Sequence, residues 1–121
     1  MSNITIQVGT ASGNVCVGAY QGNGSAGTAS KPATLYQSSG SVACPAAGAA
    51  TIALGGSCTP NLTDWLALSG DNVTATFELA AGVGTVLANG FGYAQGTAFP
   101  LPSTVGAVTG TTARTFYMRG S

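Results

Sequence analysis

The chain has 121 residues, with three basic side chains, three acidic ones, no histidine and a formal net charge of zero. This length is typical of one domain, and three scattered basic residues (Lys31, Arg114, Arg119) are too few to neutralise a run of phosphates, which argues against nucleic-acid binding. Gly, Ala, Ser and Thr make up more than half of the residues, whereas Leu, Ile, Val and Phe make up about a fifth. We therefore expect a thin apolar core and a surface with little charge to keep copies apart.

Targeting segments are not evident in the sequence. No stretch approaches the roughly 18–20 continuous apolar residues of a membrane helix. Residues 1–5 have neither the basic start nor the apolar stretch of a secretory signal. We therefore expect a chain that is made and folded in the cytoplasm and does not enter a membrane.

Alternation of apolar and polar residues dominates the N-terminal half. No segment sustains the spacing of an amphipathic helix over three turns. Period-two alternation predicts short strands over residues 3–8, 14–20, 33–37, 41–44 and 49–54. The segment 59–68 is ambiguous, because Thr59 and Pro60 suit a helix start while the apolar run Trp65–Leu68 suits a strand.

In the C-terminal half, the clearest alternation lies at 72–79, where Val73, Ala75, Phe77 and Leu79 would share one face of a strand. Asn89-Gly90 predicts a tight hairpin between 84–88 and 91–95. The run Thr111–Met118 predicts a closing strand with Phe116 and Met118 on one face.

Three segments are candidates for extended arms or loops: 1–14, 21–32 and 97–105. The second is rich in Gly, Ser, Thr and Ala, and the third contains Phe99-Pro100-Leu101-Pro102, which two prolines keep out of a helix. The pieces of chain between these extended segments are each too short to fold alone. Residues 1–121 are therefore expected to form a single all-β domain, an antiparallel sandwich or barrel-like fold with extended arms.

The sequence offers no catalytic signature. It has one Glu, two Asp and no His, so an enzyme, a cofactor site and a metal site are not expected. Asp64 and Asp71 could in principle form a paired-carboxylate site. Ordinary structural roles explain them better, because Asp71 lies in a Gly-Asp-Asn turn and Asp64 lies where a carboxylate would favour a helix N-terminus.

The three cysteines do not form an even disulfide set. Cys44 and Cys58 lie 14 residues apart and could form a disulfide, while Cys16 would remain free. The favoured interpretation is that all three are free thiols that pack as small apolar side chains.

Several large side chains are candidates for subunit contacts, since they are prominent in a chain with so few apolar residues. Core packing is the default for Trp65. Phe99 and Leu101 are the better interface candidates because of the adjacent prolines. If 1–14 is an arm, Ile4 and Ile6 join the set of candidate interface residues, which is Ile4, Ile6, Trp65, Phe99 and Leu101.

Size, composition and the long Gly/Ser/Thr/Ala-rich stretches, such as 21–32, together resemble virion structural proteins of tailed bacteriophages, in particular the small decoration or cement proteins of the capsid. The resemblance extends over the whole chain and no single motif carries it. It implies a non-enzymatic β module in the virion that forms homo-oligomers. Its partners would be the major capsid protein or other virion subunits, and its arms would bridge neighbouring subunits of the shell.

Two other functions are compatible with the sequence. A tail-fibre or adhesin domain could bind a host glycan through Trp65, with Asp64, Asp71 and Asn72 as polar partners. A filament or tail-tube subunit could pair with its neighbours through an uncharged edge such as Thr109–Thr115, in which Arg114 is the one charge.

Overall fold

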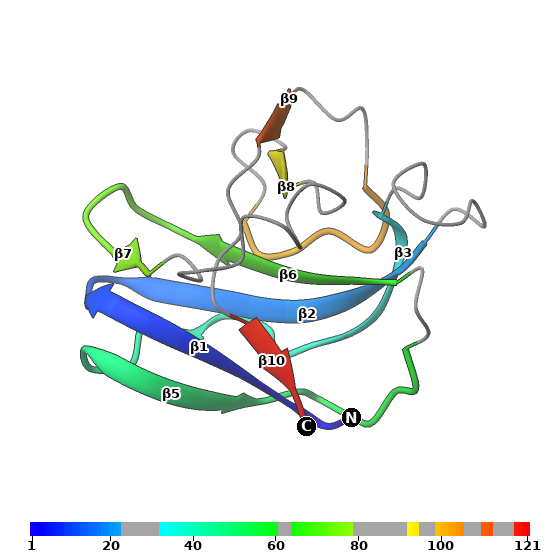
Figure 1. Ribbon diagram of the computed structural model, residues 1–121, viewed down its shortest axis with the longest axis horizontal. Coiled ribbons are helices and arrows are strands. Elements are labelled where there is room, and N and C mark those ends of the chain that lie inside the picture. The colour runs from blue at the N-terminus through cyan, green and yellow to red at the C-terminus, as the bar shows by residue number, and fades with distance from the viewer. Residues whose placement is uncertain (23–31, 61–63, 79–91, 95–98, 106–109, 113–117) are drawn as a thin grey trace, which may run out of the picture.

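The computed structural model describes residues 1–22, 32–60, 64–78, 92–94, 99–105, 110–112 and 118–121. The described strands form two four-stranded antiparallel sheets and one two-stranded pair, and these residues contain no helix. Figure 1 shows the two larger sheets stacked as layers, with β1 and β5 in one and β2, β3 and β6 in the other. The predicted all-β class is confirmed, and the architecture is a sandwich because the sheets do not close into a barrel.

The first sheet is built around β1 (Asn3–Thr10). One side of β1 pairs with β5 (Gly48–Ala53) in an unbroken antiparallel register. The other side pairs first with β10 (Met118–Gly120) and then with β7 (Thr76–Phe77). The two termini therefore lie together, as Figure 1 shows, and the Ser121 carbonyl accepts hydrogen bonds from the backbone of Ser2 at 2.7 Å and Asn3 at 3.0 Å.

The second sheet is built around β2 (Asn14–Gly22). One side pairs with β6 (Trp65–Gly70), and the other pairs with β4 (Val42–Ala43) and β3 (Pro32–Ser38). The two-stranded pair consists of β8 (Gly92–Ala94) and β9 (Gly110–Thr112).

The core lies between the two central strands. Alternate residues of β1 point inward, and so do Val15 and Val17 of β2 and Ile52 of β5. Leu54 completes this cluster, and all of these side chains are at most 9% exposed. The buried members of the cluster are Ile4, Ile6, Val8, Val15, Val17, Ile52 and Leu54.

Strand β2 is buried on both faces, since every residue from Val15 to Tyr20 is buried. Its second face is covered in part by the proline-containing segment 99–105. A Cβ built on Gly18 would lie 2.9 Å from Leu101 Cδ1 and 2.8 Å from the Gln37 carbonyl oxygen, so only glycine leaves room for this covering layer. Beyond the prolines the segment pairs with β3, because Leu35 N donates to the Ser103 carbonyl at 2.8 Å and Val105 N donates to the Ala33 carbonyl at 2.9 Å.

The predicted strand at 72–79 is largely wrong. Only Thr76–Phe77 is a strand, and Leu79 lies outside the described residues. The Asn72 side chain accepts hydrogen bonds from the backbone of Thr74 at 3.0 Å and Ala75 at 2.9 Å, which folds the chain into a turn that competes with an extended strand. Val73, expected on the buried face, is 101% exposed.

The remaining secondary-structure predictions concern residues 59–68 and the C-terminal part of the chain. The second half of 59–68 is strand β6 rather than helix, while 61–63 lie outside the described residues. The hairpin at Asn89-Gly90 and the position of Phe116 also lie outside them, whereas Met118 packs against the core from β10.

The predicted N-terminal arm at 1–14 is corrected by the structure. Ile4 is 0% exposed and Ile6 is 1% exposed, because β1 is the central strand of its sheet and both side chains point toward β2. These isoleucines are therefore core residues of their own chain and do not form an exposed interface.

Replacing Ile6 with Ala should lower the free energy of unfolding by about 2–5 kcal/mol, because the change leaves a cavity at the centre of the core. Gln7→Ala, on the opposite face of the same strand, should change it by less than about 0.5 kcal/mol. Urea unfolding followed by tryptophan fluorescence measures both variants. Equal losses for the two would place β1 outside the core.

Candidate functional site

The polar residues singled out in the sequence lie at the two ends of strand β6. Asp64 precedes this strand and Asp71 follows it. At about 3.3 Å per residue, the two carboxylates are on the order of 20 Å apart. They therefore do not form a carboxylate pair, and Asp71 and Asn72 do not lie beside Trp65 as a single glycan site would require.

Asp64 binds its own chain. The Gly22 backbone N–H donates to Asp64 Oδ1 at 2.8 Å, and the Tyr36 hydroxyl also hydrogen-bonds to this carboxylate. Burial, and then the negative charge of Asp64 and this hydrogen bond, raise the pKa of Tyr36. The Asp64 carboxylate thus connects the end of β2 and the start of β6 with Tyr36 of β3.

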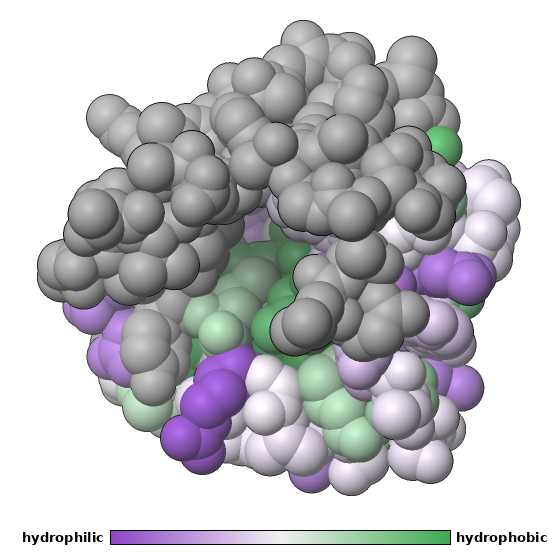
Figure 2. All heavy atoms as spheres, turned by 45° about the vertical axis from the view of Figure 1, so that its right-hand side comes forward, coloured by the Kyte–Doolittle hydropathy of each residue, from purple (hydrophilic) through white to green (hydrophobic). Residues whose placement is uncertain are grey.

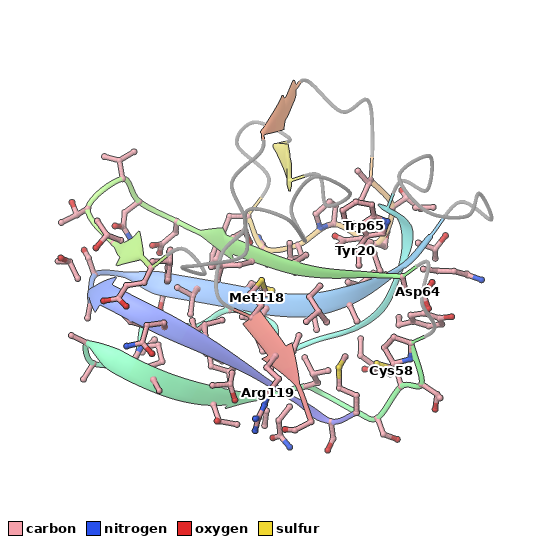
Figure 3. All side chains as sticks on the ribbon, viewed as in Figure 1. Tyr20, Cys58, Asp64, Trp65, Met118 and Arg119 are labelled. Carbon is pink, nitrogen blue, oxygen red and sulfur yellow. The ribbon has the colours of Figure 1, made fainter. Side chains whose placement is uncertain are left out.

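Tyr20 and Trp65 are opposite each other on β2 and β6, and opposite residues of an antiparallel pair share a face. Figure 3 shows the two side chains together above the sheet, with Asp64 at the end of β6. Tyr20 is 2% exposed and its hydroxyl donates to the Pro102 carbonyl at 2.6 Å. Burial, followed by the nearby Cys16, raises the pKa of Tyr20 to about 12. With Tyr20 buried and Trp65 half-buried, this corner is packed and does not present an open aromatic platform.

Asp71 fastens the other end of β6 to β2. Its Oδ1 accepts the Asn14 backbone N–H at 2.9 Å, and its Oδ2 accepts Asn14 Nδ2 at 2.8 Å. Asn72 Nδ2 also donates to Asp71 Oδ1 at 2.7 Å. The Asn14 backbone bond, then the side-chain bonds from Asn72 and Asn14, lower the pKa of Asp71 to about 2. The expected turn role belongs to Asn72, whereas Asp71 reaches a strand 57 positions away.

Two further candidate interface residues lie on the segment that covers β2. Phe99 and Leu101 are both half-buried, and the Phe99-Pro100 peptide bond is cis. Leu101 lies over Gly18, so at least part of this side chain packs against its own chain.

The three cysteines are free thiols in the structure. Cys16 is buried on β2, whereas Cys44 and Cys58 are half-buried and pack against the core. Cys58 is also tied to the N-terminus, since the Met1 amino group donates to its carbonyl at 2.8 Å and its N–H donates to the Met1 carbonyl at 2.9 Å.

The outer surface of the first sheet is exposed along β5 and at Arg119 and half-buried along β1. Strands β1, β5 and β10 turn short polar or small side chains away from the core here, and Arg119 is the one charged member. We call this surface the outer face; its residues are Asn3, Thr5, Gln7, Ala49, Thr51, Ala53 and Arg119. Figure 3 shows Arg119 on the side of β10 away from Met118. In Figure 2 the described surface in view mixes pale, purple and green residues, with green residues gathered near the centre.

The outer face ends at strand β5. No described strand pairs with the side of β5 that is turned away from β1. Ala49, Thr51 and Ala53 are exposed, and Thr51 and Thr5 share a hydroxyl hydrogen bond of 2.8 Å across the β1–β5 pair. The outer face therefore continues to an open sheet edge.

Within the described part of the chain, no group of three His, Cys, Asp or Glu side chains is placed to hold a metal ion. The same residues contain no helix long and apolar enough to cross a membrane. Comparison with protein families, curated proteins and solved structures gives no match.

Sequence reasoning missed the outer face. Its signal was present in 48–53, where Ala and Thr alternate with residues that enter the core and no charge interrupts the strand. The sequence does not show which strands pair with each side of 48–53, and this pairing decides whether a strand is central or at an edge.

Asp71→Asn should lower the urea midpoint at pH 7, because a carboxylate whose pKa is depressed to about 2 stabilises the fold above its ordinary value of 3.8. That contribution disappears as the pH falls from about 4 toward 2, so the variant and the wild type should converge there. Glu78→Gln, which removes an exposed carboxylate seven residues further along the chain, is the control and should change the urea midpoint at pH 7 far less than Asp71→Asn does. A constant difference between Asp71→Asn and the wild type across this range would contradict the assignment.

Thiol titration in denaturant, without prior reduction, should give three reactive groups per chain, since all three cysteines are free. In the native protein Cys16 should react slowest because it is 0% exposed. A count of one in denaturant would reveal a bridge between two of the cysteines.

Proposed function

We propose that this chain is a non-enzymatic virion structural protein, a capsid decoration protein that stabilises the shell by bridging neighbouring capsid subunits. The observation that carries the proposal is the outer face, which spans three strands and has Arg119 as its one charge. A surface of this kind suits permanent contact with another protein surface.

The physical argument concerns desolvation. Burying a charged side chain at an interface costs free energy unless it is paired, whereas small hydroxyl and methyl groups are buried at little cost. Of the other charged side chains that the structure describes, Asp64 and Asp71 already accept hydrogen bonds from their own chain. The described surface therefore offers broad contact with few charges to desolvate.

Decoration also suits the small size of the module. One copy offers a modest contact area, but a copy that bridges two subunits makes its second contact at a high effective concentration. The alternative of a glycan-binding domain loses support, because the side chains it would use are separated along β6 and engaged within the fold.

Density-purified virus particles from cells that carry this gene should contain the chain in a fixed ratio to the major capsid protein. Particles made without the gene should release their genome at a lower temperature, and adding the purified chain should restore the wild-type release temperature. Adding heat-unfolded chain is the matched control. Particles that contain no copy of the chain would contradict the proposal.

A further inference from the structure

The backbone groups of β5 alternate in direction, and the structure fixes which ones face outward. Leu54 N donates to the Ser2 carbonyl at 2.8 Å, in the same register that sets Ile52 opposite Ile4. In an antiparallel pair every second residue bonds to the partner, so Ile52 and Ala50 direct their N–H and C=O groups toward β1. Ala49, Thr51 and Ala53 must then direct theirs to the open edge.

This edge lacks the features that usually prevent strand addition. From Gly48 to Ala53 there is no charge and no proline, and the pairing with β1 is regular, without a bulge. No described strand covers it, and the three outward-facing residues are exposed. Such an edge is a template for another strand.

We propose that the occupant is the β5 strand of a second copy of this chain, antiparallel and related by a two-fold axis at Thr51. Thr51 then lies opposite Thr51 of the other copy, and Ala49 lies opposite Ala53. All three residues face the partner with their backbone donors and acceptors, so the register satisfies every outward-facing group of the edge at once. The two first sheets become one continuous sheet.

The side chains of β5 favour a copy of itself as the partner. On the outer face, the existing Thr5–Thr51 hydroxyl bond of 2.8 Å would extend into a row of four threonines across the axis. On the inner face, Ala50 would lie opposite Ile52 of the other copy, a small side chain beside a large one. No pair in this register brings two charges together, since β5 has none. The pairing does not depend on the virion role.

The experiment compares two double variants by sedimentation velocity over a hundredfold range of concentration. In the proposed register position 49 faces position 53 of the other copy. A49K/A53K therefore sets Lys against Lys twice, and A49K/A53E sets Lys against Glu twice. Both change the same two exposed positions, and circular dichroism with thermal melting verifies the fold of each.

The wild type should show a concentration-dependent monomer–dimer equilibrium. A49K/A53K should raise the dissociation constant on the order of tenfold or more, because like charges meet at the edge. A49K/A53E should dimerise at least as well as the wild type, and A49K/A53K mixed with A49E/A53E should form the mixed dimer even if either variant is marginally stable alone.

Three results would overturn the proposal. A wild type that stays monomeric at the highest concentration leaves the edge without this partner. An A49K/A53K variant that dimerises as tightly as the wild type places the contact elsewhere. An A49K/A53E variant as weak as A49K/A53K rules out the two-fold register. Since none of these uses virus particles, failure here is distinguishable from failure of the decoration role.

Discussion

The packing of β1 against β2 is the contact on which the rest of the structure depends. The chain has few large apolar side chains, and the structure places most of the buried ones on these two strands and on β5. Ile4, Ile6 and Val8 face Val15 and Val17. Each of the two central strands pairs with other strands along both of its edges. A thin core is sufficient because both central strands are paired on both edges, and β2 is also covered from outside the sandwich by a segment that Gly18 allows to approach closely.

Both aspartates serve this same arrangement. Asp64 binds the Gly22 backbone at the end of β2, and Asp71 binds Asn14 at its start, so β6 is fastened to β2 by a carboxylate at each end. A charge-assisted hydrogen bond to a backbone N–H is stronger than a neutral one. In a chain with three acidic residues, using two of them this way leaves little acidic surface for chemistry with a ligand.

The sequence predicted the strands that alternate clearly and have apolar residues to bury, such as β1, β2 and β5. The strand prediction failed at 72–75. The apolar alternation of Val73 and Ala75 suggested a strand, but the Asn72 side chain accepts backbone hydrogen bonds that hold these residues in a turn. Sequence reasoning also gave Asp71 a local role in the turn, although its partner Asn14 is distant in sequence. It predicted a strand over 3–8 but still counted Ile4 and Ile6 as interface candidates of a possible arm. Local patterns predict which residues are extended, whereas the neighbours of a strand depend on long-range pairing that a single sequence does not reveal.

Native-state hydrogen exchange along β5, at a concentration where sedimentation velocity shows the monomer, tests the closed interior and the uncharged open edge together. The amides of Ala50 and Ile52 should be protected because they bond to β1, while those of Ala49, Thr51 and Ala53 should exchange orders of magnitude faster. Uniform protection along β5 would mean that another segment covers the edge, and uniform fast exchange would mean that β5 is not part of the sheet. Either uniform pattern would contradict the account.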